Sequence, residues 1–122
     1  MPRLVEMDTS VTFFEQMNEK GGPVVLINTF TMNSEDVDRF LKAWTADAEV
    51  MKRQPGFIST QLYRGIAGST VFVNYAVWES TQHFKDAFWN LEIQAQLRDY
   101  PSSVAGSPHL FRKAAVPGIC VD

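Results

Sequence analysis

Residues 71–79, with the sequence VFVNYAVWE, decide the fold. Successive side chains of a β-strand point to opposite faces, so this segment would place its residues in two rows. One row contains Phe72, Asn74, Ala76 and Trp78, and the other contains Val71, Val73, Tyr75 and Val77. Both rows are mostly apolar, whereas an antiparallel strand with one face in water alternates apolar with polar residues. The segment therefore predicts a strand that is buried on both faces.

Outward from this strand, strand and helix signals alternate along the chain. Residues 24–32 (VVLINTFTM) and 57–64 are rich in β-branched and aromatic residues, which favour strands. Between them, Ser34 is a good N-cap for a helix that ends near Arg53, before Pro55. Apolar residues recur in this helix at the spacing of a buried face, at Val37, Phe40, Leu41, Trp44, Ala48 and Met51.

A second helix is predicted to begin at Ser80 or Thr81 and to end before Pro101, although Asn90 could cap a new helix and kink it. Its apolar residues are Phe84, Ala87, Phe88, Leu91 and Ala95. Residues 102–108 are typical of a loop, and residues 110–116 favour a last strand. The order β-α-β-β-α-β is that of ferredoxin-like folds. We therefore expect an α+β domain with a four-stranded antiparallel sheet and two helices on one face.

The length of 122 residues fits one domain. Residues 23–122 would form this domain, including a short C-terminal tail. Residues 1–22 would form an N-terminal extension, in which Ser10 could cap a short helix with Val11, Phe14 and Met17 on one side.

Charge and cysteine content exclude several classes of partner. The formal charge is -3, with 11 Lys and Arg against 14 Asp and Glu, and no run of positive charge favours nucleic acid. The single cysteine, Cys120, cannot form an intrachain disulfide, which fits a reducing cytoplasm. No apolar run resembles a signal peptide or a membrane span. We expect a cytoplasmic protein with no membrane or nucleic-acid partner.

The second apolar face of the strand at residues 71–79 predicts a homodimer. Two helices cover only one face of the sheet, so Val71, Val73, Tyr75 and Val77 would be left exposed in a monomer. An apolar sheet face of this kind is buried most simply against a second copy of the chain. The alternative is a monomer in which the N-terminal segment covers this face.

Conventional catalytic motifs are absent from the sequence. It contains no glycine-rich phosphate loop, no HExxH, no CxxC and no GxSxG. Its two histidines, His83 and His109, are too few for a three-histidine metal site, and lone histidines are usually surface or packing residues. We expect no metal.

Two asparagines and a tryptophan on the helix-facing side of the sheet are the main candidates for chemistry. Asn28 lies in the middle of the first strand, and Asn74 lies four residues before Trp78. A buried amide without a partner costs about 1 to 3 kcal/mol, so each asparagine needs a protein or ligand partner. The alternative is that the two amides bond each other or nearby backbone.

Further residues would complete a pocket for a planar aromatic ligand. Arg98 lies seven residues after Leu91, so a continuous helix would turn it toward the pocket, unless it only compensates the helix C-terminus. The wall would be aromatic, with Phe30, Phe40, Trp44, Phe84 and Phe88. Such residues more often form a plain hydrophobic core.

With this element order, PGF after the first helix and NYAVWES leading into the second, the chain resembles the antibiotic biosynthesis monooxygenase family of dimeric α/β-barrel proteins over about residues 23–116. The resemblance implies an active site between sheet and helices. It also implies oxidation of anthrone-type polyketides to quinones by O2, with no flavin, haem or metal.

The resemblance also implies roles for individual residues. Asn74 and Trp78 match an asparagine and a tryptophan four residues apart in the anthrone oxygenases, and Arg98 and Asn28 match an arginine and a second asparagine. A tyrosine of the family is Phe84 here. A haem-degrading branch uses the asparagine that Asn28 matches, together with a tryptophan and an iron-ligating histidine expected near Asp86 and Gln96. This chain has no histidine there, so haem is less expected.

These observations lead to the hypothesis of a cofactor-independent monooxygenase that acts on a planar phenol, anthrone or hydroquinone. Asn74 and Trp78 would donate hydrogen bonds to the substrate oxygen, Asn28 would orient a second oxygen, and Arg98 would favour the anion. His83, at the mouth of the second helix, is a candidate base. A cofactor-free cyclase or isomerase and a non-catalytic dimeric binding protein are the alternatives.

Overall fold

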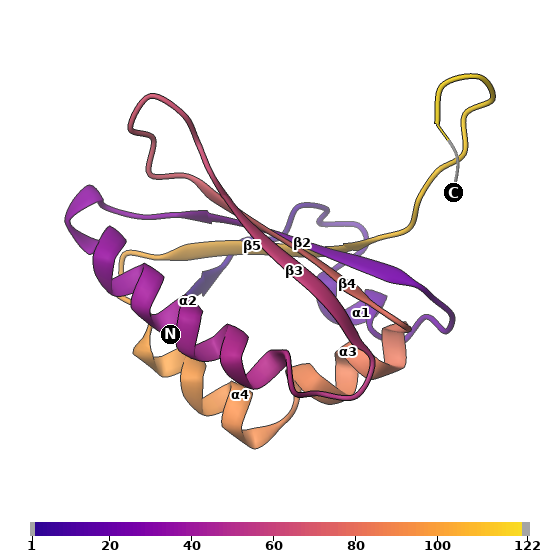
Figure 1. Cartoon of the computed structure of the whole chain (residues 1–122), viewed down its shortest axis with the longest axis horizontal. Helices are drawn as coiled ribbons and strands as arrows, with labels where there is room; N and C mark the ends of the chain where they lie inside the picture. Colours follow the sequence, from indigo (N-terminus) through magenta and orange to yellow (C-terminus); the bar gives the residue numbers. More distant parts are fainter. Residues whose placement is uncertain (1, 121–122) are drawn as a thin grey trace.

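The structure is a computed structural model that describes residues 2–120. Its sheet has five strands in the order β1-β5-β2-β4-β3. The strands are β1 (Arg3–Leu4), β2 (Val24–Thr31), β3 (Phe57–Arg64), β4 (Phe72–Trp78) and β5 (Ala105–Phe111). The α-helices are α1 (Phe13–Gln16), α2 (Val37–Met51), α3 (Thr81–Phe88) and α4 (Leu91–Gln96), with 3-10 turns η1 (Ser34–Asp36) and η2 (Leu97–Asp99). Figure 1 shows α2, α3 and α4 on one side of the sheet.

From β2 onward the predicted order is confirmed. Antiparallel pairing joins β2 to β4, β2 to β5, and β3 to β4, which is the ferredoxin-like arrangement. The prediction of a four-stranded, wholly antiparallel sheet was wrong, because β1 pairs in parallel with β5 and makes the sheet five-stranded and mixed. The N–H groups of Arg3 and Val5 donate to the carbonyls of Val104 and Gly106 at 2.9 and 2.8 Å. Two residues are too few to show strand periodicity in a sequence.

The last strand lies earlier in the chain than predicted. It spans Ala105–Phe111 rather than residues 110–116, so most of the expected loop is strand. Gly106, Ser107 and Pro108 favour loops in a sequence, but here Pro108 lies in the sheet opposite Asn28. Tertiary pairing with β2 overrides the local preference.

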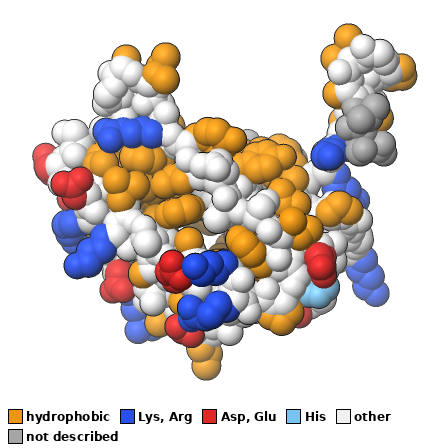
Figure 2. All heavy atoms as spheres, viewed as in Figure 1, with side chains coloured by type: hydrophobic (Ala, Val, Ile, Leu, Met, Phe, Trp, Pro, Cys, Tyr) orange, Lys and Arg blue, Asp and Glu red, His pale blue; other side chains and the backbone are white. Residues whose placement is uncertain are grey.

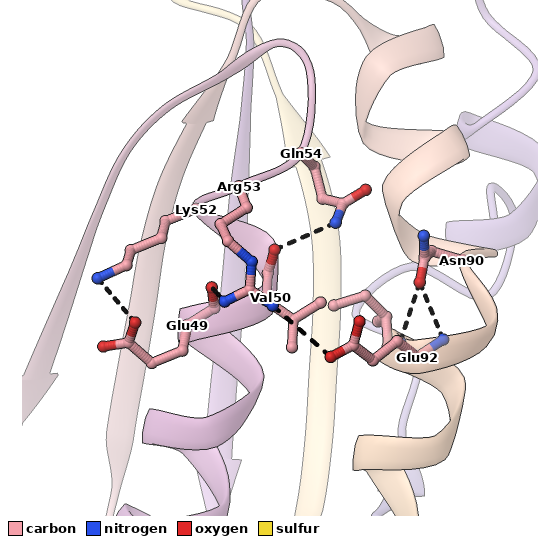
Figure 3. A network of polar contacts seen from close by, with 8 residues as sticks. Glu49, Val50, Lys52, Arg53, Gln54, Asn90 and Glu92 are labelled. Carbon is pink, nitrogen blue, oxygen red and sulfur yellow. Dashed lines mark hydrogen bonds and ion pairs between the residues drawn. The ribbon is translucent and has the colours of Figure 1, made fainter.

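The expected kink at Asn90 is confirmed as a complete break between α3 and α4. The Asn90 side chain accepts hydrogen bonds from the backbone N–H groups of Glu92 and Ile93 at 2.9 and 3.4 Å (Figure 3). The break resets the rotation of the helix, so Ile93 is buried while Leu91 is 86% exposed. The prediction that Leu91 and Ala95 are buried was therefore wrong.

Two buried clusters lie between the sheet and the helices. The Trp78 cluster consists of Phe13, Met17, Val24, Leu26, Ala76, Trp78, Phe84, Ala87 and Leu110. The Phe40 cluster consists of Phe30, Val37, Phe40, Ala43, Phe72, Tyr100 and Val104. Asn28 pairs with Asn74 across β2 and β4, between the positions that belong to the two clusters. The middle of the sheet is therefore polar, with a hydrophobic cluster on each side.

The N-terminal segment packs against the fold. Its helix α1 is capped by Thr12 rather than by Ser10, since the Thr12 hydroxyl accepts from the backbone N–H of Glu15 at 3.3 Å. Consequently Phe13 and Met17 are buried, whereas Val11 and Phe14, expected on the same side of the helix as Met17, are exposed. The carboxamide of Gln16 bonds both the backbone N–H and the carbonyl of Leu110, at 2.8 and 2.9 Å, and so continues the edge pairing of β5 begun by β1.

The sheet face opposite the helices is apolar and open. Val71 and Tyr75 remain 38% and 39% exposed, and Tyr63, Ile58 and Phe111 are exposed as well. Figure 2 shows hydrophobic side chains gathered over the part of the molecule where the strands lie. The described residues of the N-terminal segment leave these side chains uncovered. Over residues 2–120, the structure contains no helix that is long and apolar enough to cross a membrane.

Candidate active site

A cavity of about 250 Å³ lies between the sheet and the helices. Its walls come from β2, β3, β4 and β5 of the sheet and from α2, α3, α4 and the N-terminal segment. Seven of the ten residues proposed from the sequence line it: Asn28, Phe30, Trp44, Asn74, Trp78, Phe84 and Phe88. Most of the lining is aromatic or aliphatic, as in sites that bind flat organic molecules.

The other three proposed residues do not line this cavity. Phe40 of α2 is fully buried and packs directly against the rings of Phe30 and Phe72. His83 bonds the hydroxyl of Ser80 through Nδ1 at 2.7 Å, at the N-terminus of α3. Arg98 is exposed on η2, because the helix break at Asn90 changes the direction of its side chain. The expectation that Arg98 points into the pocket required a continuous helix.

The side-chain amides of Asn74 and Asn28 differ in their hydrogen bonding. The hydroxyl of Thr60 on β3 donates to Asn74 Oδ1 at 2.6 Å, so the N–H₂ end of the Asn74 amide is left to donate elsewhere. Asn28 Oδ1 is buried, and no described residue donates a hydrogen bond to it. Gly106 of β5 leaves room beside this oxygen, since a Cβ at position 106 would lie 3.3 Å from it. Neither oxygen bonds the other asparagine.

Trp78 presents a buried donor without an acceptor. Phe57 and Phe84 hold its ring edge-to-face, with centroid separations of 5.4 and 5.7 Å. The side chain is 1% exposed, and Nε1 finds no acceptor in the described part of the chain. An unpaired buried donor costs about 1 to 3 kcal/mol, and a ligand oxygen would recover that free energy.

A partly buried carboxylate, which was not among the residues predicted from the sequence, lies in the same cavity. Asp47 on α2 lines the cavity, and its Oδ2 accepts a hydrogen bond from the Tyr100 hydroxyl at 3.0 Å. Its Oδ1 is buried with no partner among residues 2–120. Burial raises the pKa of Asp47 from 3.8 to about 6, and the Tyr100 hydrogen bond opposes that shift. Burial and the Asp47 charge raise the pKa of Tyr100, which stays protonated.

The sequence spacing alone places Asp47 on the buried face of α2. It lies three residues after Trp44 and seven after Phe40, so it falls on the apolar face that defines α2. A charged residue on a buried helical face is rare unless it is paired or functional. The apolar residues of that face predict a buried helix, and Asp47 is the charged exception among them.

The N-terminal segment also contributes to the cavity. Pro2, Leu4, Phe13 and Phe14 are among the lining residues. Phe14 stacks on Trp89 with a centroid separation of 5.9 Å, and both rings are about half exposed. These two rings therefore flank an opening of the cavity between α1 and the end of α3.

No group of three or more His, Cys, Asp or Glu side chains in residues 2–120 is placed to hold a metal ion. The polar atoms that the cavity offers are an amide donor, an indole donor, an amide oxygen and a carboxylate. This set can bind a molecule that carries oxygen atoms, and it can accept a proton from that molecule.

The family model described as antibiotic biosynthesis monooxygenase matches residues 23–95, which is more than half of the chain. No curated protein matches the chain at a significant level.

Solved structures match over most of the chain. SnoaB of Streptomyces nogalater, a cofactor-independent oxygenase, is 22% identical with a TM-score of 0.72, covering 80% of this chain and 99% of its own. A candidate monooxygenase of Shewanella loihica PV-4 is 30% identical with a TM-score of 0.64, covering 78% of this chain and 97% of its own. The first match supports the fold, and the second supports the family as well.

Proposed function

Because the chain belongs to the antibiotic biosynthesis monooxygenase family, we propose that it is a cofactor-independent monooxygenase. It oxidises a planar phenolic, anthrone or hydroquinone-like substrate with O2 to a quinone. The observation that carries this proposal is the buried Nε1–H of Trp78, which has no acceptor in residues 2–120 and belongs to an aromatic cavity that Asn74 also lines.

Such a substrate supplies its own electrons. Loss of a proton gives an enolate or phenolate, which reduces O2 by one electron before the two radicals combine. The protein then has to bind the substrate, exclude water and stabilise the negative oxygen. Trp78 and Asn74 donate hydrogen bonds to that oxygen, and Asn28 Oδ1 accepts one from a second oxygen that carries a hydrogen. Arg98 has no part in this proposal, because it is exposed outside the cavity.

Size also favours a substrate with several fused rings. The cavity has a volume of about 250 Å³, and its lining is mostly aromatic or aliphatic. The flat aromatic walls at Phe30, Phe84 and Phe88 would pack against its ring faces.

Oxygen uptake tests this function. The purified protein should consume one O2 for each molecule of anthrone or hydroquinone converted, with the quinone measured by absorbance. Turnover of a related substrate without O2 consumption would instead identify a cyclase or isomerase. Binding of aromatic ligands that raises the melting temperature, without turnover of any of them, would identify a binding protein.

The proposal predicts activity without a bound cofactor. The protein should be colourless, and dialysis against EDTA should leave its kcat unchanged, because the substrate and O2 exchange electrons directly. Absorption spectroscopy and metal analysis after gentle purification measure this. A stoichiometric flavin, or haem with an iron-histidine signature, would contradict the prediction and would restore the haem-degrading alternative.

The open sheet face supports a homodimer as the functional form. Burial of apolar surface contributes about 25 cal/mol per Å², so two copies of the face around Val73 and Val77 would associate strongly. Wild type should sediment at twice its chain mass of 13.8 kDa. Val73→Asp should dissociate the dimer, while Lys42→Asp on the exposed side of α2 should not. A wild-type monomer at micromolar concentration would refute the homodimer.

A further inference from the structure

Asp47 and Tyr100 are the residues with ionisable side chains in the lining of the cavity, as described. The other polar lining residues are amides, a threonine hydroxyl and indoles. The proposed oxidation begins with removal of a proton from the substrate, so its base must be one of these two residues or water. Tyr100 is already protonated, which leaves Asp47.

The two carboxylate oxygens of Asp47 differ in their hydrogen bonding. Oδ2 accepts the Tyr100 hydroxyl, which fixes the orientation of the carboxylate. Tyr100 is itself fixed, since its ring stacks on Phe30 at 6.2 Å with an interplanar angle of 9°. No residue from 2 to 120 donates a hydrogen bond to Oδ1, although this oxygen is buried in a cavity-lining side chain. A general base needs a free oxygen of this kind, held in position by its neighbours.

Within residues 2–120, no positive charge holds this carboxylate as a structural ion pair. The basic residues of the adjoining elements are engaged elsewhere or exposed: Arg53 pairs with Glu92, Lys52 pairs with Glu49, and Lys42 and Arg98 face solvent. A buried carboxylate without a cation costs folding free energy, so Asp47 gains nothing for the fold from its negative charge. Burial instead makes the carboxylate a stronger base, because it raises the pKa of Asp47 to about 6.

We propose that Oδ1 of Asp47 is the general base that removes a proton from the substrate, and that Tyr100 positions it. In this arrangement the acidic hydrogen of the substrate faces α2, and its oxygen faces Trp78 and Asn74 on the sheet. The oxygen-dependent part of this inference rests on the proposed function, whereas the proton transfer does not.

The atoms balance over the reaction of an anthrone with O2. The methylene carbon loses a proton to Asp47 Oδ1, and the resulting anion gives one electron to O2. The carbon radical and superoxide then form a C–O bond, and Asp47 returns its proton to the peroxide. In the last step the O–O bond breaks and the remaining hydrogen on the carbon leaves as a proton. One oxygen atom ends in the new carbonyl and the other in water.

Hydrogen exchange without oxygen tests the role of Asp47. Wild-type protein is mixed with anthrone in D2O under argon, and loss of the methylene signal is followed by proton NMR. Wild type should accelerate this exchange above the buffer rate. Asp47→Asn, which keeps the shape of the side chain, should reduce the accelerated rate by about a hundredfold or more. Asp38→Asn, an exposed carboxylate on the same helix, should exchange like wild type.

Tyr100→Phe separates a positioning role from a packing role. This variant keeps the ring on Phe30 and removes the hydrogen bond that lowers the pKa of Asp47. Exchange should therefore persist, with the midpoint of its pH profile moved upward from about 6. An unchanged midpoint would remove Tyr100 from the proposal.

The outcomes keep the two proposals apart. Exchange in Asp47→Asn within about threefold of wild type, or no acceleration by wild type, would overturn the role of Asp47. Exchange that depends on Asp47 without O2 uptake when air is admitted would support Asp47 as the base and refute the oxygenase. O2 uptake by Asp47→Asn at the wild-type rate would support the oxygenase and refute Asp47 as the base.

Discussion

Trp78→Phe is expected to lower kcat by about a hundred- to thousandfold while the protein remains folded, which is the effect of removing one preorganised donor to a developing anion. The indole Nε1–H makes no hydrogen bond to residues 2–120, so its removal breaks no internal bond. The ring contacts with Phe57 and Phe84 are largely kept by phenylalanine. Rate constants from O2 uptake, with the melting temperature of each variant, measure the two effects separately.

Asn74→Ala should lower kcat to a similar extent, but it also affects stability. Its Oδ1 accepts the Thr60 hydroxyl, so the variant leaves that hydroxyl without its partner at a cost of about 1 kcal/mol. Thr60→Val is the matched control, because it removes the same hydrogen bond and leaves the Asn74 amide in the cavity. If the kcat values of Trp78→Phe and Asn74→Ala both lie within about threefold of wild type, these residues have packing roles only.

The sheet positions could be predicted because strand periodicity is simple. Asn28, Asn74 and Trp78 share one face of two paired strands, and alternation alone places them there. The cavity between sheet and helices follows from that face and from the apolar side of α2. These predictions depend on local backbone geometry that the strand pairing preserves.

Predictions that depended on helix rotation were less successful. Arg98 was placed by counting turns from Leu91, and the break at Asn90 changes the rotation before Arg98 is reached. Sequence spacing indicated the break but not its size. His83 lies on the predicted helix, yet its bond to Ser80 turns it toward the helix N-terminus. Capping bonds of this kind compete with any role in the cavity.

Sequence patterns could not predict the contacts between segments that are far apart in the chain. Phe13 reaches the Trp78 cluster and the two-residue strand β1 reaches β5 only after the chain has folded. Asp47 and Tyr100 are separated by 53 positions, and neither residue alone distinguishes a base from a surface group. The hydrogen bond between them, and the burial that they share, appear only in the folded structure.

Asp47→Asn is expected to stabilise the protein at pH 7 while it removes the proposed base. The pKa of Asp47 is about 6 in the folded state against an ordinary value of 3.8. The unfolded chain therefore releases this proton at lower pH than the folded chain. Stability falls as pH rises between these two values, because the folded state must bury the charge. A difference of about 2 pKa units corresponds to up to about 3 kcal/mol of unfolding free energy.

Urea denaturation of wild type and Asp47→Asn at equal protomer concentration measures this difference. At pH 7 the variant should be more stable, and near pH 4 the two proteins should converge, since protonated aspartate and asparagine are both neutral. Asp38→Asn controls for the loss of a charge on α2. A variant less stable than wild type at pH 7 would show that the carboxylate supports the fold. The expected combination of greater stability and lost proton transfer cannot come from damaged packing, because damaged packing lowers stability and activity together.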